Sequence, residues 1–279
     1  MRYLKNILLI IVGICIISCE ANVDASDLLK KDQLVVINGY LSPQDTTLKV
    51  QVSKSKSRAT PKINNDELVV KNATVVLYDE EKNEVSLVYT DTSFNYEAPA
   101  SDLRIIPGKK YFLKVIVDGK EYKASCTIPS KKVEKIDYKI EIKQSEFSSN
   151  RLLRLTIEDI KEQNDFYIVG ATVTKSLNNV EVIDFELGQF ATDISRENTI
   201  ITADGYFTIF DGASQNSRLK IKVANTEKIL YDALRTTYLN DSNDANPFSE
   251  TVIAPNNING ENGFGVFAGY QLTEKEVTF

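Results

Sequence analysis

Apolar and polar residues alternate along most of the chain after residue 33, and this period of two predicts β-strands. In the stretch "TTLKVQV" every second side chain is apolar, which places one face of a strand in a core and the other in solvent. The apolar positions are Leu48, Val50 and Val52, and the polar positions are Thr47, Lys49 and Gln51. The stretches "NATVVLYD" and "YFLKVIV" follow the same rule.

Turn signals separate these strands as far as residue 129. Pro107-Gly108 suits the middle of a tight turn. Asp118-Gly119 predicts a two-residue hairpin between a strand that ends at 117 and one that begins at 120, which Pro129 terminates. Residues 33–129 therefore predict a first domain of about seven short strands, an antiparallel β-sandwich of the immunoglobulin or transthyretin type.

Residues 130–279 predict a second β-rich domain that carries one α-helix. Alternation continues through "KIDYKIEI", "LLRLTIED", "DFYIVGATVT", "VEVIDFEL", "GYFTIF" and "RLKIKV". Helical spacing in "NTEKILYDALRTTYLN" predicts a helix over 226–239 that follows a cap at Asn225. The stripe expected to pack on the second sheet consists of Leu230, Ala233, Leu234, Thr237 and Tyr238.

Three side chains of this helix are candidate contacts for a ligand or a protein partner: Tyr231, Arg235 and Tyr238. Tyr231 and Arg235 are expected on a face that flanks the apolar stripe. Packing within the protein is the simpler interpretation, and both interpretations stay open at this stage.

The stretch "GFGVFAG" at 263–269 fits the dinucleotide-binding pattern G-x-G-x-x-A. Such a loop follows a buried strand, opens a helix and needs an acid about twenty residues further on. Here "NNINGEN" precedes the glycines, and we expect no room for the helix and the acid. We therefore expect a strand in which Phe264, Val266 and Ala268 share a face, with glycines that permit a bulge or a close backbone approach.

The first eighteen residues resemble the signal peptide of a bacterial lipoprotein. Arg2 and Lys5 precede Ile7–Ile17, an apolar run of eleven residues that is too short to span a bilayer. The run ends in Ile16-Ile17-Ser18-Cys19, which resembles a lipobox. A plain signal peptide with a chance cysteine, or an amino-terminal anchor helix, is the alternative.

Cys19 is accordingly predicted to be the acylated first residue of the mature protein, followed by a tether over 19–32. Glu20 stands where an Asp holds some lipoproteins at the inner membrane, and with Asp24 and Asp27 it resembles the acidic tether of surface lipoproteins of Bacteroidota. We expect a lipid-anchored outer-membrane protein exposed at the cell surface. A periplasm-facing anchor is the alternative.

Charge and residue usage exclude several classes of function. Removal of residues 1–18 leaves 31 basic and 39 acidic residues, a net charge of −8, so a nucleic-acid partner is not expected. Cys126 is then the one cysteine besides Cys19, and no intramolecular disulfide is expected. The chain has no histidine, which rules out Ser-His-Asp and Cys-His catalysis and His-based metal sites.

No catalytic residue, cofactor or metal is expected. The stretch Asp241–Asn246 has the look of a calcium loop, but Asn246 replaces the glycine of an EF-hand and Val252 replaces its last acid. A polar loop is the simpler interpretation, and a looser calcium site is the alternative.

The stretch "NPFSETVIAPNNINGENGFGVFAGY" at 246–270 resembles the carboxy-terminal signature of a family of exported Bacteroidota lipoproteins, domain of unknown function 4249. The signature runs Asn/Asp-Pro-Phe, Asn-Ile, and Gly-x-Gly-x-Phe, here Asn246-Pro247-Phe248, Asn257-Ile258 and Gly263-Phe264-Gly265-Val266-Phe267. "LVVINGYLSP", "LKVQVSKSK" and "NATVVLYD" extend the resemblance to about residues 34–270. Glu261-Asn262 interrupts the glycine run. The signature residues expected to be structural are Asn246, Pro247, Phe248, Gly263, Gly265 and Phe267.

This resemblance implies a mostly β, lipidated outer-membrane protein, and family members are often encoded beside TonB-dependent receptors. It implies a non-enzymatic accessory protein that helps such a transporter to capture or take up a nutrient, with an exposed aromatic cluster or apolar patch for docking. A structural or adhesive surface protein is one alternative. A carboxylate-dependent hydrolase is another, and it requires two acids at catalytic separation in a cleft.

Overall fold

The computed structural model describes residues 33–56, 65–144, 149–160, 165–177, 180–193, 200–208, 217–243 and 250–278. The expected signal peptide and tether, Cys19 and the motif residues Asn246, Pro247 and Phe248 lie outside the described residues. In the described part of the chain, no helix is long and apolar enough to cross a bilayer.

Over the described residues the fold is mainly β, as the alternation predicts, with one long α-helix. An eleven-stranded sheet has the order β11-β10-β13-β14-β1-β2-β5-β4-β3-β6-β7, and a second sheet has the order β12-β9-β8. The strands before residue 130 are β1 (Val35–Leu41), β2 (Thr47–Lys54), β3 (Thr74–Asp79), β4 (Glu84–Thr90), β5 (Asn95–Pro99), β6 (Lys110–Val117) and β7 (Lys120–Thr127), with a short 3-10 helix, η1 (Asn65–Leu68). The later elements are β8 (Ile136–Gln144), β9 (Ser149–Glu158), β10 (Phe166–Leu177), β11 (Val180–Thr192), β12 (Ile200–Thr208), β13 (Ser217–Thr226), α3 (Lys228–Asn243) and β14 (Gly263–Thr278).

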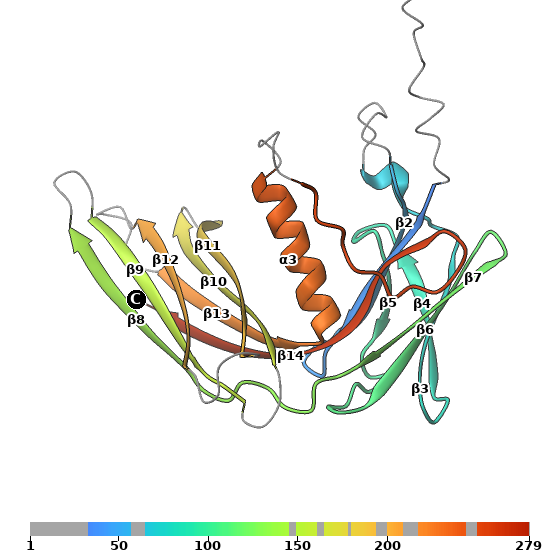
Figure 1. The fold of residues 1–279 in the computed structure, drawn as a ribbon, viewed down its shortest axis with the longest axis horizontal. Helices are drawn as coiled ribbons and strands as arrows, with labels where there is room; N and C mark the ends of the chain where they lie inside the picture. Colours follow the sequence, from blue (N-terminus) through green and yellow to red (C-terminus); the bar gives the residue numbers. More distant parts are fainter. Residues whose placement is uncertain are drawn as a thin grey trace, which may run out of the picture.

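Two separate cores correspond to the two halves of the chain. Strands β1 to β7 curl around the first core, and an isolated bridge between Lys123 and Asn259 brings β7 back beside the approach to β14. In the second half, the small β12-β9-β8 sheet packs against β10 and β13 and encloses the second core. Figure 1 shows both halves, with α3 standing between them.

β14 joins the two halves, and its pairing corrects the expectation of a purely antiparallel first sheet. Its first part pairs parallel with β1, from Val35 opposite Gly263 to Leu41 opposite Gly269. Its second part pairs antiparallel with β13, from Thr226 opposite Tyr270 to Arg218 opposite Thr278. The large sheet is therefore mixed, because a strand from the carboxy-terminal end of the chain inserts beside the first strand (Figure 1). The domain boundary at 129/130 stays a prediction. β14 comes after this boundary in the sequence but pairs with a strand from each side of it.

The strand expected for "GFGVFAG" is the first part of β14, and its glycines allow close backbone approach. Gly265 has a φ of 123°, and a Cβ built there would lie 2.1 Å from the Ile37 carbonyl oxygen of β1. Phe267 lies on one face of the strand and packs in the first core. Val266 and Ala268 lie on the other face and pack against α3. The glycine spacing therefore serves strand pairing.

Replacing Gly265 with Ala is expected to lower the free energy of unfolding by about 2 kcal/mol or more. The added Cβ would force β1 and β14 apart, and φ lies in a region that L residues rarely adopt. Gly188→Ala is the matched control, because a Cβ there meets nothing within 4 Å. Urea unfolding followed by circular dichroism measures both variants, and equal losses would contradict this account of β14.

Candidate functional site

Helix α3 stands on β14 at the junction of the two halves (Figure 1). Leu230 and Ala233 of the helix pack with Val266 and Ala268 of β14, and the cluster is extended by Tyr40, Ile168, Ile229, Leu234 and Tyr270. The helix found over Lys228–Asn243 matches the predicted helix in place and type. This packing fixes the helix between the two halves, and so it fixes the positions of the side chains on the helix surface.

The buried face of α3 differs from the stripe expected from the sequence. Tyr231 is buried, and its ring contacts Phe166 and Phe190 with centroid distances of 5.4 Å and 5.6 Å. Burial raises the pKa of the Tyr231 hydroxyl. Thr237 and Tyr238 are exposed instead. The helix is turned so that Tyr231 faces the protein, because Phe166 of β10 and Phe190 of β11 pack against its ring.

The other two helix candidates lie at the surface. Arg235 is exposed, and Tyr238 has 54% of its surface exposed while its ring lies 5.8 Å from that of Phe190. The structure thus brings Tyr231 and Tyr238 to the same phenylalanine, one inside the protein and one at its surface.

Further apolar exposure lies at the carboxy-terminal end of α3. Val252 is 46% exposed and Ile253 is 88% exposed. The Asn240 side chain holds this segment to the helix, because its Nδ2 donates to the Val252 carbonyl and its Oδ1 accepts from the Val252 N–H, both at 3.0 Å. We call Tyr238, Val252 and Ile253 the α3 tip.

Glu227, and not Asn225, begins the helix. Asn225 belongs to β13, and its Nδ2 donates to the Lys131 carbonyl and to Asp165 Oδ1, both at 3.0 Å. The Glu227 carbonyl accepts from Leu230 N at 3.1 Å and Tyr231 N at 3.2 Å, the first hydrogen bonds of the helix. Its carboxylate accepts from Thr127 N at 2.9 Å and Gly269 N at 2.6 Å. One side chain therefore ties β7 and β14 to the start of α3.

The signature residue Asn257 also binds both β7 and β14, and its Nδ2 donates to the Ser125 carbonyl of β7 at 3.4 Å. Its Nδ2 donates to the Phe267 carbonyl at 2.7 Å, and its Oδ1 accepts from Phe267 N at 2.9 Å, as a neighbouring strand would. Ile258, the next residue, is buried in the first core. Gly263, Gly265 and Phe267 lie in the strand to which Asn257 binds. The described part of the signature thus forms the junction between β7 and β14.

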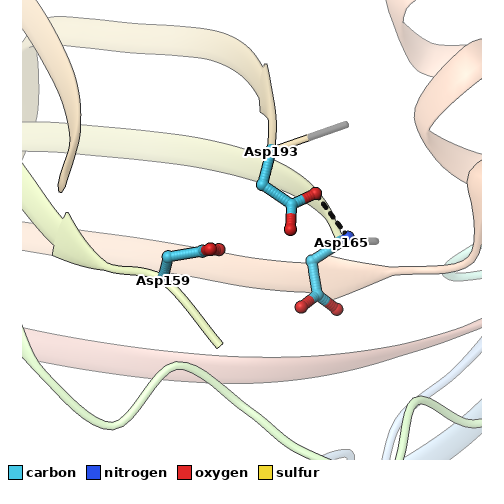
Figure 2. A group of neighbouring side chains, drawn as sticks. All are labelled: Asp159, Asp165 and Asp193. Carbon is cyan, nitrogen blue, oxygen red and sulfur yellow. Dashed lines mark hydrogen bonds between the residues drawn. The ribbon is translucent and has the colours of Figure 1, made fainter. Parts of the chain in front are cut away.

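Three aspartates meet where β9, β10 and β11 end or begin, and sequence reasoning missed them. Carboxylate oxygens of Asp159, Asp165 and Asp193 all lie within 4.8 Å of one another (Figure 2). Asp165 is buried, and its N–H donates to Asp193 Oδ1 at 2.8 Å. The hairpin pairing of Phe166 with Thr192 places the flanking Asp165 and Asp193 together, a register that the sequence alone does not reveal.

Hydrogen-bond donors of the protein itself already bind two of these carboxylates. The Tyr167 hydroxyl donates to Asp159 Oδ1 at 2.7 Å, and Asn225 donates to Asp165. Carboxylate oxygens are the ligands that Ca²⁺ prefers, but Ca²⁺ takes about six to eight of them. The arrangement can contribute oxygens to a cation and also serves to fix the ends of three strands.

A cavity of about 370 Å³ opens on the sheet face that carries α3, and it too was missed. Its lining residues are Asn38, Gly39, Tyr40, Asp45, Thr47, Lys49, Gln51, Asn95 and Tyr270. The Tyr270 hydroxyl donates to Asp45 Oδ1 at 2.9 Å, and Ser42 N donates to Asp45 Oδ2 at 3.0 Å. Burial raises the pKa of Asp45, and burial beside Asp45 raises that of Tyr270. The outward polar positions of β1 and β2 line this hollow.

The Glu227 tie predicts a specific pH dependence. Burial raises the pKa of this carboxyl from its ordinary value of 4.5, against the opposing effect of the Gly269 and Thr127 N–H groups. The folded state therefore binds the proton more tightly than the unfolded state, so the contribution of Glu227 to stability decreases as pH rises above 4.5 and through the raised pKa. Glu227→Gln removes this titration.

The free energy of unfolding of the wild type minus that of Glu227→Gln should accordingly fall as pH rises above 4.5 and through the raised pKa. Urea unfolding at a series of pH values measures this difference. A difference that grows with pH would contradict the assignment of a raised pKa.

The hydrogen bonds of Tyr167 should contribute to the stability of the second half. Its buried hydroxyl accepts from Ile160 N at 3.0 Å and donates to Asp159. Tyr167→Phe is expected to lower the free energy of unfolding by about 1–3 kcal/mol, because it leaves both partners without this hydroxyl. Tyr238→Phe, which changes a half-exposed ring, should cost less than about 0.5 kcal/mol in the same unfolding experiment, and a similar loss for both would contradict this role.

Comparisons with known proteins place the chain in a family. No curated protein matches it. A two-domain fibronectin type-III segment of chicken tenascin is similar over 70% of this chain and 91% of that one, with 10% identity and a TM-score of 0.22, which is too weak to carry an argument. The family model for DUF4249, a domain of unknown function, matches residues 19–276. The chain therefore belongs to the DUF4249 family.

Proposed function

We propose that this protein is a lipid-anchored outer-membrane accessory protein that assists a TonB-dependent transporter in capturing or taking up a nutrient, without catalysing a reaction. The observation that carries the proposal is Ser18-Cys19 at the end of the apolar run Ile7–Ile17. The family match begins at residue 19, the residue predicted to carry the lipid. An acyl anchor with more than one chain holds a protein stably at a membrane surface.

The α3 tip supports a docking role. Tyr238 of α3 is a large, half-exposed aromatic side chain, and Val252 and Ile253 are exposed in the segment that Asn240 holds to the same helix. The helix itself is packed on β14. Rigid, exposed apolar and aromatic residues are typical of protein–protein contact sites. The tip is therefore the surface at which we propose that the transporter binds.

The cavity supports a binding role over a hydrolytic one. Glycoside hydrolysis by carboxylates needs two acids that flank the scissile bond. Of the residues that line this cavity, Asp45 is the one acid. A structural or adhesive surface protein is a second alternative, and it does not require one particular transporter.

We also propose a fold class for the first half of the chain. We group the curled sheet of β1 to β7 with immunoglobulin- or transthyretin-like sandwiches, because opposed parts of the sheet enclose a single core.

Affinity purification of the tagged, lipidated protein from outer membranes in mild detergent tests the proposal. We expect one β-barrel receptor to co-purify, and we expect Cys19→Ala to lose it because the unanchored protein no longer reaches the membrane. Ile253→Asp should lose the receptor while staying anchored, since a charge would interrupt the α3 tip.

Val88→Asp is the matched control, because Val88 is 71% exposed but belongs to β4. Recovery of the anchored wild type alone, under conditions that preserve a known barrel complex, would contradict the transporter role. Equal loss with Ile253→Asp and Val88→Asp would contradict the assignment of the α3 tip.

A further inference from the structure

The cavity beside β1 and β2 is lined by side chains suited to a ligand with many hydroxyl groups. Asn38 and Gln51 lie directly opposite each other on paired strands. Asn95 precedes Tyr96, the residue that pairs with Val50, so it lies beside Gln51 on the next strand. Three amide side chains therefore cross the floor of the cavity in one row. Protein partners orient two of the amides, because Asn38 Oδ1 accepts from Val266 N at 3.1 Å and Asn95 Nδ2 donates to the Ser93 carbonyl at 2.8 Å. An amide carries two N–H donors and an oxygen that accepts twice, so each of the three side chains can still bind a ligand.

Aromatic rings and a fixed acceptor form the wall nearest α3. Tyr40 and Tyr270 line the cavity and pack against the helix cluster, so helix packing restrains both rings. Asp45 is fixed by the hydrogen bonds from Tyr270 and Ser42. Side chains held in this way lose little conformational entropy when a ligand binds.

The charges of the lining disfavour ionic ligands. Lys49 is the one cation in the lining, and its Nζ lies 3.3 Å from Glu97 Oε1. An anion would meet Asp45 with no unpaired cation to compensate. A cation would have to compete for Asp45 with the Tyr270 and Ser42 donors. The lining therefore favours a neutral ligand.

Backbone pairing disfavours an added peptide strand. β1 is paired with β14 and β2, and β2 is paired with β1 and β5, so neither strand presents an edge in the cavity. Strand addition requires such an edge. A ligand here must be recognised by side chains.

We infer that this cavity binds a neutral sugar of one or two hexose units, with its hydroxyls on the amide row of Asn38, Gln51 and Asn95 and its apolar face on Tyr40 or Tyr270. Sugars combine hydroxyls that donate and accept with ring faces that pack on aromatic side chains. The volume of about 370 Å³ lies at the small end of the range for small-molecule sites. The inference does not depend on the transporter of the proposed function, and the chain alone tests it.

The test is saturation-transfer NMR and calorimetric titration of the mature chain with glucose, galactose, mannose, N-acetylglucosamine, maltose and cellobiose. We expect at least one of these sugars to bind in the millimolar range or more tightly. Gln51→Ala should weaken that sugar by about three- to tenfold, the loss typical of a hydrogen bond between neutral groups. Gln51→Trp should abolish binding by filling the cavity. Ser86→Ala, at an exposed position of β4, should leave binding unchanged.

Three results would overturn the inference. The first is that none of these sugars binds to a folded wild type. The second is a sugar that binds equally well to Gln51→Trp, since it would then occupy another place. The third is tighter binding of glucose 6-phosphate than of glucose, because it would show a site for anions. Circular dichroism of each variant ensures that loss of binding is not loss of folding.

Discussion

The pairing of β14 with β1 on one side and β13 on the other is the constraint on which the rest of the structure depends. A single strand of sixteen residues belongs to both halves of the large sheet, and it changes partner between Gly269 and Tyr270. Its first part lies so close to β1 that position 265 has no room for a Cβ. Asn257 and Glu227 then secure the strand through hydrogen bonds to Phe267 and Gly269.

The two candidate binding surfaces, the α3 tip and the cavity, both depend on β14. α3 rests on Val266 and Ala268, and the α3 tip projects from its far end. The cavity shares Tyr270 with β14, and Tyr270 in turn fixes Asp45. A disturbance of the β1–β14 pairing should therefore reach the helix and the cavity together. This arrangement suits a protein that presents surfaces to a ligand and a partner.

The local features of the fold follow from the sequence, whereas the long-range ones do not. Alternation, turn residues and helical spacing predict strands, the 118–119 hairpin and the helix, because these depend on neighbours in the chain. The parallel pairing of residues 35–41 with 263–269 depends on contacts across more than two hundred residues, and no local pattern encodes it. The glycines of the signature predicted that another backbone segment lies close to this strand, but they did not identify β1 as that segment.

The candidate site was less predictable for the same reason. Tyr231 is inside because Phe166 and Phe190 come from other strands to meet it. The Asp cluster and the cavity assemble from separate strands, so none of their residues forms a motif in the sequence. The lipid attachment at Cys19, by contrast, rests on a contiguous motif and remains a prediction for chemistry to test.

Coincidence of unfolding in the two halves tests the central role of β14 most directly. In the chain from residue 20 onward, Cys126 is the one cysteine, and it is buried in the first core. Ala171→Cys in a Cys126→Ala background places a matched thiol in the second core. If β14 makes the halves one cooperative unit, each thiol should become reactive at the urea concentration at which its own variant loses its circular dichroism. A thiol that becomes reactive at a different urea concentration from the loss of circular dichroism in the same variant would contradict the account.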